Sequence, residues 1–231
     1  MKAILLAAGL GTRLYPLTKD KPKALVEVQG KPLLQHQLEK LKKEGFKKVL
    51  INIHHFGDQI ISFLEKNKNF GLDIEISDES SKLLDTGGAL RKASEFIRGE
   101  DPVFIHNVDV ISTISFKEML NSHRLTGAYA TLAIRKRETK RYLLFNEKNK
   151  LCAWENVETG EKKGDWKDDN LTRAAFSGIH ILSPKCIDLF PEKEAFSIID
   201  FYLEAAKNHF ICGYFHDESI WLDVGKVESL A

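Results

Sequence analysis

The sequence has few cysteines and no long apolar run. Its 231 residues include three cysteines, Cys152, Cys186 and Cys212, which are far apart and not spaced as metal ligands. This usage favours reduced thiols, most of them buried, over disulfides or a zinc site. No apolar stretch approaches the roughly twenty residues that a membrane helix needs. We therefore expect a cytoplasmic protein that does not bind membranes.

The net charge of the chain is also close to zero. The chain carries 34 basic and 33 acidic side chains, a formal net charge of +1. Nothing in this balance suggests a nucleic-acid or membrane surface, so neither is an expected partner. With 43% hydrophobic residues, the chain is long enough to bury one sizeable core. No internal repeat is visible, and we expect a single domain over residues 1–231.

The opening stretch, MKAILLAAGLGTRLYPLTKDKPKALVEV, allows three interpretations. Lys2 and the apolar residues after it resemble a secretory signal, but the run is short and Gly-Leu-Gly-Thr-Arg follows at once. The same residues predict a short buried strand at the centre of a parallel sheet, followed by a glycine turn. The third interpretation is a dinucleotide loop.

Two known glycine loops do not fit this turn. Leu14 stands where a dinucleotide loop has its third glycine, and the Gly-Lys-Ser/Thr of a Walker A loop is missing. What remains is the turn from Gly9 to Arg13, followed by Lys21-Pro22-Lys23. Glycine lets backbone N–H groups approach a phosphate chain, arginine adds a bidentate fork and lysine a mobile charge. The pattern indicates a triphosphate site without a Walker lysine.

Predicted strands and helices alternate in the first half. Strands are expected over 48–53, 72–77 and 102–106, and helices over 32–44, 57–67 and 86–96. This alternation predicts an α/β fold, a Rossmann-like mixed and mostly parallel sheet with helices on both faces. Gly9 to Arg13 follow the first strand, and Asp109 follows the strand at 102–106. Both loops should therefore face one crevice.

The second half is richer in strands. They are predicted over 128–135, 142–145, 151–155, 173–182 and 211–215, with helices over 184–190 and 197–208. Residues 157–170 are dense in Lys, Asp, Glu and Gly without apolar periodicity, which predicts a mobile surface loop. The sequence stops at Ala231, where residues 226–231 are compatible with a helix, so a short tail could follow.

The stretch LAAGLGTRLYPLTKDKPKALVEVQGKPLLQH resembles the signature of the sugar-1-phosphate nucleotidylyltransferases. The resemblance implies an enzyme that transfers a nucleoside monophosphate from a nucleoside triphosphate to a sugar 1-phosphate and releases pyrophosphate. It implies a fold of the nucleotide-diphospho-sugar transferase type, with Mg²⁺ as cofactor. Residues 1–231 would be a catalytic domain without the C-terminal β-helix domain of some larger relatives.

The resemblance also implies roles for individual residues. Arg13 would contact the β- and γ-phosphates, and Lys23 would lie near the α-phosphate. The implied nucleotide-binding residues are Ala8, Gly9, Gly11, Thr12, Gly87 and Gly88. The paired glycines also fit a plain helix entry capped by Thr86.

Two distant aspartates are the candidate metal ligands. Asp109 follows a predicted strand, and Asp223 lies in Trp221-Leu222-Asp223-Val224-Gly225. Two carboxylates at strand ends can hold Mg²⁺, although a single aspartate is more often a cap or turn residue. The metal-binding aspartates of the family match these two positions.

The chain departs from the family pattern at two places. Val108 stands where the family usually has glycine, and valine disfavours positive φ and fills space. Many relatives carry Glu-Lys-Pro, whose lysine holds the sugar phosphate, whereas this chain has Glu155-Asn156-Val157. Lys162, Lys163 or no lysine would take that role. Glu155 and Gly178 are the candidate sugar-binding residues, and Gly178 fits a glycine bulge in a core strand equally well.

Several functions remain open within and outside the family. The pattern looks most like N-acetylmuramate-1-phosphate uridylyltransferases of cell-wall recycling, and mannose- or heptose-1-phosphate guanylyltransferases share much of it. A non-catalytic subunit that binds a nucleotide sugar is the alternative of another class. A glycosyltransferase ranks last, because Val110 and Ile111 follow Asp109 where an Asp-x-Asp motif would be needed. The sequence does not determine the oligomeric state.

Overall fold

The computed structural model describes residues 1–225, and the expected helix at 226–231 lies outside them. The strands are β1 (Lys2–Leu6), β2 (Glu27–Val28), β3 (Lys31–Pro32), β4 (Lys48–Ile53), β5 (Asp73–Asp78), β6 (Val103–Asn107), β7 (Val110–Ser112), β8 (Ala130–Arg135), β9 (Arg141–Phe145), β10 (Leu151–Asn156), β11 (Lys162–Gly164), β12 (Thr172–Leu182), β13 (Ile211–Phe215) and β14 (Trp221–Asp223). The α-helices are α1 (Leu33–Lys43), α2 (Gly57–Lys66), α3 (Asp85–Lys92), α4 (Ser94–Ile97), α5 (Phe116–Thr126) and α6 (Ile198–Ala205). Short 3₁₀ turns are η1 (Thr12–Leu14), η2 (Lys23–Leu25), η3 (Lys68–Gly71) and η4 (Pro184–Leu189).

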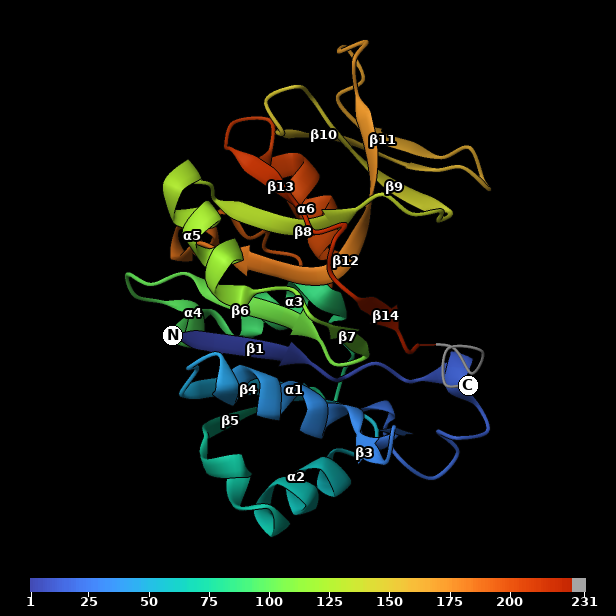
Figure 1. The fold of residues 1–231 in the computed structure, drawn as a ribbon, viewed down its shortest axis with the longest axis vertical. Coiled ribbons are helices and arrows are strands. Elements are labelled where there is room, and N and C mark those ends of the chain that lie inside the picture. The colour runs from blue at the N-terminus through green and yellow to red at the C-terminus, as the bar shows by residue number, and fades with distance from the viewer. Residues whose placement is uncertain (226–231) are drawn as a thin grey trace.

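A ten-stranded mixed sheet forms the centre of the molecule (Figure 1). Its main path is β11-β10-β9-β12-β6-β1-β4-β5, with β8 beside β12 and β13 beside β8. Strands β6, β1, β4 and β5 are parallel to one another, whereas β12 runs antiparallel to β6. This arrangement confirms the expected α/β fold with a mixed sheet, whose strand-rich second half is mainly antiparallel.

Both faces of the sheet are buried by helices. In β1, Ala3 and Leu5 pack into one core cluster with residues of α1, α2 and α5. Ile4 between them packs into a second cluster with residues of α3, α4 and α6. Successive residues of a strand point to opposite faces, so this alternation requires a layer of helices on each side. Among residues 1–225, no helix combines the length and apolar character of a membrane span.

The structure corrects two predicted elements. The helix expected over 86–96 is divided into α3 and α4, and the Ser94 hydroxyl donates a hydrogen bond to the Arg91 carbonyl at the break. The expected loop 157–170 contains β11, which pairs with β10. This strand has no apolar pattern and forms because the edge of β10 offers free N–H and C=O groups.

Four buried histidines predict a marked loss of stability in acid. Burial lowers the pKa of His106 and His180 to about 3, and that of His123 and His216 to about 4, from 6.5. The unfolded chain therefore binds more protons as pH falls below about 6.5. We expect the free energy of unfolding to decrease between pH 6.5 and 4, by roughly 1.4 kcal/mol per pH unit for each histidine.

Urea unfolding at pH 7.5 and at pH 5.0 measures this effect. The pH 7.5 value should exceed the pH 5.0 value, and His180→Gln should reduce the difference. Equal free energies at the two pH values would mean that these histidines titrate alike in the folded and unfolded chain.

Candidate active site

The candidate site lies at the carboxyl ends of β1 and β6. These parallel neighbours are in register, with Leu6 opposite Asn107. The N–H of Val108 donates to the Leu6 carbonyl (3.1 Å), so the two following loops start side by side. Val108 is buried and is not among the positive-φ residues of the described chain. The turn that leads to Asp109 therefore does not need the glycine that the family usually has there.

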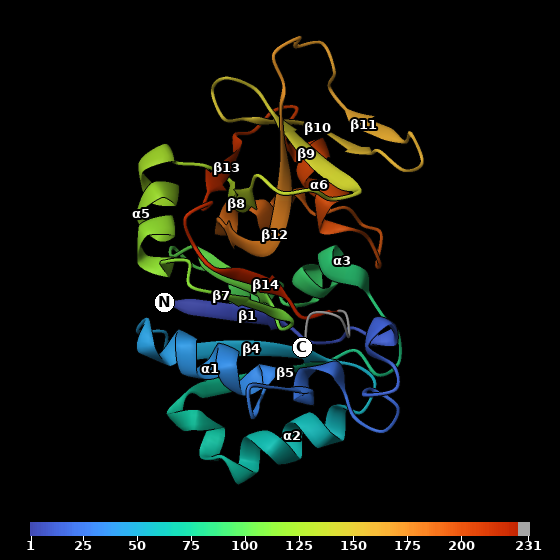
Figure 2. The same ribbon diagram turned by 45° about the vertical axis from the view of Figure 1, so that its right-hand side comes forward.

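A two-stranded ribbon brings the two aspartates together. Strand β14 pairs with β7, with Asp223 opposite Val110, and the N–H of Val224 donates to the Asp109 carbonyl (2.9 Å). Figure 2 shows β14 and β7 running next to each other. The ribbon therefore sets Asp109 and Asp223 next to each other although they are 114 positions apart in the sequence.

Gly225 marks the point where the charged side chains converge. A methyl group on Gly225 would lie 2.7 Å from Asp223 Oδ1, 3.0 Å from Asp109 Oδ2 and 3.0 Å from Arg13 Nη2. Two carboxylate oxygens and one guanidinium nitrogen thus surround one point. The structure brings together the two candidate metal ligands and the candidate phosphate-binding arginine.

The glycine turn folds against the second basic element. Gly11 has φ +66°, and a methyl group there would lie 2.9 Å from Thr18 Cγ2 and 3.1 Å from Lys23 Cβ, so both the backbone and the space require glycine. The ammonium group of Lys23 forms an ion pair with Asp109, and both side chains are mostly buried. Thr12 and Arg13, in η1, are exposed.

A cavity of about 260 Å³ adjoins this cluster. Four of the predicted residues line it, namely Ala8, Gly9, Lys23 and Asp109. Its other lining residues are Leu6, Asn52, Glu79, Leu83, Asp85, Thr86, Asn107 and Val108. Gly11 and Thr12 are not among them.

Sequence reasoning missed a buried polar network on the wall of this cavity. Glu79 is 1% exposed, and it accepts hydrogen bonds from the Asn52 amide (2.8 Å) and the Leu84 N–H (3.3 Å). Asn52 in turn accepts from the N–H of Ala7 (2.7 Å). The network ties the loop after β1 to the ends of β4 and β5. An asparagine within the apolar strand KVLINI was the available signal.

The paired glycines pack against a distant segment of the chain. Gly87 and Gly88 donate their N–H groups to the Phe196 carbonyl, at 2.8 and 3.3 Å, and are not among the residues that line the cavity. A methyl group on Gly88 would lie 2.2 Å from the Glu194 carbonyl oxygen. These glycines therefore allow α3 to pack on the segment 194–196. From this part of the chain, Asp85 and Thr86 line the cavity instead.

A second cavity, of about 600 Å³, lies on the other side of Asp85. It shares Asp85 with the first cavity and reaches the charged cluster through Asp223. Its other lining residues are Arg137, Thr139, Arg141, Leu143, Trp154, Glu161, Lys163, Phe176, Ser197, Ile199 and Asp200. The charged cluster thus adjoins both cavities, through Asp109 on one side and Asp223 on the other.

The two predicted sugar-binding residues do not line this second cavity. In β10, Trp154 lines it, whereas the adjacent Glu155 is 4% exposed and forms an ion pair with Arg173. Neighbouring strand residues point to opposite faces, so Trp154 and Glu155 cannot both face the cavity. Gly178 has φ +73° where the β12 register shifts, and a methyl group there would lie 2.8 Å from Asn107 Nδ2. The glycine-bulge interpretation of Gly178 therefore agrees with the structure.

The two candidate lysines of β11 differ in position. Lys163 lines the second cavity and pairs with Asp200 (2.9 Å) and Glu161 (3.5 Å). The hydrogen bond to Asp200 raises the pKa of Lys163. Lys162 does not line the cavity, and its ammonium lies 4.4 Å from the centre of the Trp166 ring.

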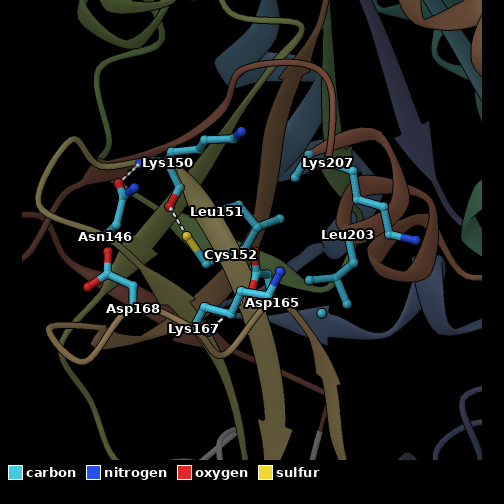
Figure 3. Close-up of a pocket in the computed structure, with 11 residues that line it drawn as sticks. Asn146, Lys150, Leu151, Cys152, Asp165, Lys167, Asp168, Leu203 and Lys207 are labelled. Carbon is cyan, nitrogen blue, oxygen red and sulfur yellow. Dashed lines mark hydrogen bonds between the residues drawn. The ribbon is translucent and has the colours of Figure 1, made fainter.

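A further cavity of about 730 Å³ lies apart from this site (Figure 3). It includes Leu151, Cys152, Lys167 and Leu203, and it shares no lining residue with the two cavities above. Burial raises the pKa of the Cys152 thiol. A protonated thiol is a weak nucleophile, so this cavity offers no obvious chemistry.

Comparison with known proteins identifies the family. The model of the nucleotidyl transferase family matches residues 2–231. The chain belongs to this family. N-acetylmuramate alpha-1-phosphate uridylyltransferase of Caulobacter vibrioides is 46% identical over 111 residues, which are 47% of this chain and 46% of that protein. Mannose-1-phosphate guanyltransferase of Yarrowia lipolytica is 32% identical over 235 residues, 98% of this chain and 61% of that protein. The chain thus spans less than two thirds of these relatives.

Two solved structures share the fold. A putative glucose-1-phosphate thymidylyltransferase from Bacillus anthracis superposes with a TM-score of 0.80 at 23% identity, over 100% of this chain and 92% of that one. HddC from Yersinia pseudotuberculosis, complexed with GMP-PN, gives 0.77 at 23% identity, over 99% and 95% of the two chains. The family and the fold type that the opening signature implied are both confirmed.

Proposed function

We propose that this protein transfers a nucleoside monophosphate from a nucleoside triphosphate to a sugar 1-phosphate, with release of pyrophosphate. The observation that carries the proposal is the convergence of Asp109, Asp223 and Arg13 where two cavities adjoin. Two anionic substrates need two pockets and a shared centre of compensating charge. We assign the nucleoside to the 260 Å³ cavity and the sugar to the 600 Å³ cavity.

The reaction needs positioning and charge compensation more than a base. A phosphate oxygen of the sugar 1-phosphate, already anionic at neutral pH, attacks the α-phosphorus of the triphosphate. The bond from that phosphorus to the oxygen bridging the α- and β-phosphates breaks, and pyrophosphate leaves with the electron pair. Arg13 would stabilise the β- and γ-phosphates, Lys23 the α-phosphate, and the backbone of Gly11 and Thr12 the phosphate chain between them.

The aspartate pair fits a magnesium ion. Among residues 1–225, no group of three or more His, Cys, Asp or Glu side chains could hold a metal. A pair of carboxylates suits Mg²⁺, which takes oxygen ligands and keeps several waters while it contacts substrate phosphates. Asp109 and Asp223 would therefore hold the ion. When bound, Mg²⁺ supplies positive charge that offsets the phosphate oxygens.

For the substrates, we favour UTP with N-acetylmuramate 1-phosphate. The uridylyltransferase similarity over 111 residues supports this pair. The sugar cavity has Arg137 and Arg141 on its wall, and no ion pair of the described residues includes either of them. N-acetylmuramate 1-phosphate carries a carboxylate besides its phosphate, so two arginines suit it.

GTP with mannose 1-phosphate is the second candidate pair, and heptose 1-phosphate is a further acceptor for GTP. Similarity to the mannose-1-phosphate guanyltransferases, over 98% of this chain, favours mannose. A non-catalytic nucleotide-sugar-binding subunit is not favoured, since Arg13, Lys23 and both aspartates are present.

Pyrophosphate release from each of the four nucleoside triphosphates with a panel of sugar 1-phosphates tests the proposal. We expect the highest kcat/KM for UTP with N-acetylmuramate 1-phosphate. A maximum for GTP with mannose 1-phosphate or heptose 1-phosphate would favour the guanylyltransferase instead. Tight binding of a nucleotide sugar without pyrophosphate release from any pair would overturn the proposal.

Gly225→Ala should separate catalysis from stability. The three atoms nearest to the added methyl group would all be the ends of side chains. The fold can therefore adjust, while the two carboxylates and the guanidinium must move apart. We expect kcat to fall at least about tenfold, since small displacements of reacting groups are costly, with little change in the melting temperature. Pyrophosphate assays and thermal unfolding measure the two effects. A variant with full kcat would show that this spacing does not matter.

A further inference from the structure

Arg137 follows β8 and extends into the 600 Å³ cavity that also contains Asp223. Its guanidinium carbon lies 4.5 Å from the centre of the Trp221 ring, and its Nη2 donates to the Phe176 carbonyl (3.3 Å). The indole N–H of Trp221 in turn donates to the Ser177 carbonyl (2.9 Å). The guanidinium is therefore held in place by an aromatic ring and a backbone carbonyl.

Within the part of the chain that the structure describes, this guanidinium has no acidic partner. None of the ion pairs within residues 1–225 includes Arg137. Among residues 1–225, its buried Nε has no hydrogen-bond partner. Its Nη1 donates a hydrogen bond to the Glu138 carbonyl (3.3 Å). Burial lowers the pKa of Arg137, and the charge of Asp223 opposes this effect. A half-buried cation with unused donors is stabilised when an anion binds it.

We propose that Arg137 binds the phosphate of the sugar 1-phosphate and so replaces the lysine that many relatives use. This inference rests on the proposed function. Arg137 stacks on Trp221, two residues before Asp223, and the charge of Asp223 acts on its pKa. A phosphate held by Arg137 would therefore lie on the side of the cavity that adjoins the charged cluster. Its planar fork suits two phosphate oxygens at once, and the Trp221 stack reduces the ordering that binding requires.

The other cations of the cavity are less suited to this task. Lys163 is already neutralised by Asp200 and Glu161. Arg141 is exposed at the start of β9, where water screens its charge.

Steady-state kinetics of Arg137→Gln test the inference. One substrate is varied while the other is saturating, first the sugar 1-phosphate and then the triphosphate. We expect the KM for the sugar 1-phosphate to rise roughly 10- to 100-fold, as when a hydrogen bond to a charged group is lost. The KM for the triphosphate should stay within about twofold. Arg137→Lys keeps the charge but not the planar fork, so its KM for the sugar 1-phosphate should lie between those of the wild type and Arg137→Gln. If the glutamine variant does not fold, the lysine variant tests the inference instead.

Two lysine variants complete the experiment. Lys162→Gln is the matched control, because Lys162 lies outside the cavity, and it should leave both KM values unchanged. Lys163→Gln should change the KM for the sugar 1-phosphate by less than about threefold. The inference would be overturned if both Arg137 variants kept the wild-type KM for the sugar 1-phosphate. It would also be overturned if this KM rose in Lys163→Gln and not in the Arg137 variants. Failure of the wild-type protein with every substrate pair would overturn the proposed function itself.

Discussion

Asp223→Asn should lower the turnover of pyrophosphate release at least about hundredfold, the loss expected when one group that stabilises transition-state charge is removed. Asn retains an oxygen that can accept the 2.9 Å hydrogen bond from the Gly225 N–H, so the fold at the end of β14 should persist. What disappears is the negative charge that would hold Mg²⁺. A higher Mg²⁺ concentration should therefore restore part of the lost rate, measured as kcat over a Mg²⁺ titration.

Asp217→Asn is the matched control for this variant. Asp217 lies on the same C-terminal segment and accepts a hydrogen bond from the Lys136 N–H (2.7 Å), but it lines neither cavity. Its turnover should equal that of the wild-type protein. Wild-type turnover in Asp223→Asn as well would remove Asp223 from the mechanism.

Arg13→Ala should also reduce turnover at least about hundredfold. The side chain is exposed, so it is free to bind the phosphates that leave as pyrophosphate. Its Nη2 lies close to both carboxylates, which places it at the charged cluster. Arg13→Lys should recover only part of the rate, because an ammonium lacks the bidentate fork. Steady-state assays with the triphosphate varied give both kcat and KM.

Arg98→Ala provides the comparison for Arg13. Arg98 is a surface arginine that pairs with Glu95 and lines neither cavity. Its loss should leave the kinetics unchanged. An Arg13→Ala protein that also kept its normal rate would mean that pyrophosphate leaves without help from this side chain.

Local signals in the sequence predicted the centre of the fold. The glycine turn after an apolar run and the position of Asp109 after β6 follow from short-range patterns and from the rule that ligands bind at the carboxyl ends of parallel strands. The proximity of Asp109 and Asp223 depends on the pairing of β7 with β14, each three residues long. Strands this short leave no periodicity, so the family resemblance alone indicated Asp223.

The walls of the sugar cavity were harder to predict. Trp154 and Glu155 are neighbours in β10, and which of them faces the cavity depends on the register with β9 and β11. Gly87 and Gly88 pack against the segment 194–196, a contact between residues more than a hundred positions apart. Arg137 belongs to no motif. Its importance appears only when its neighbours in space, Trp221 and Asp223, are known.

A double-variant cycle on Asp109→Asn and Asp223→Asn tests the central claim most directly. If both carboxylates hold one ion, the first substitution already removes most of its contribution, and the double variant should be about as slow as either single variant, roughly hundredfold below wild type. If the effects multiply, to roughly ten-thousandfold, the two aspartates act independently, and the account of a shared metal centre is contradicted.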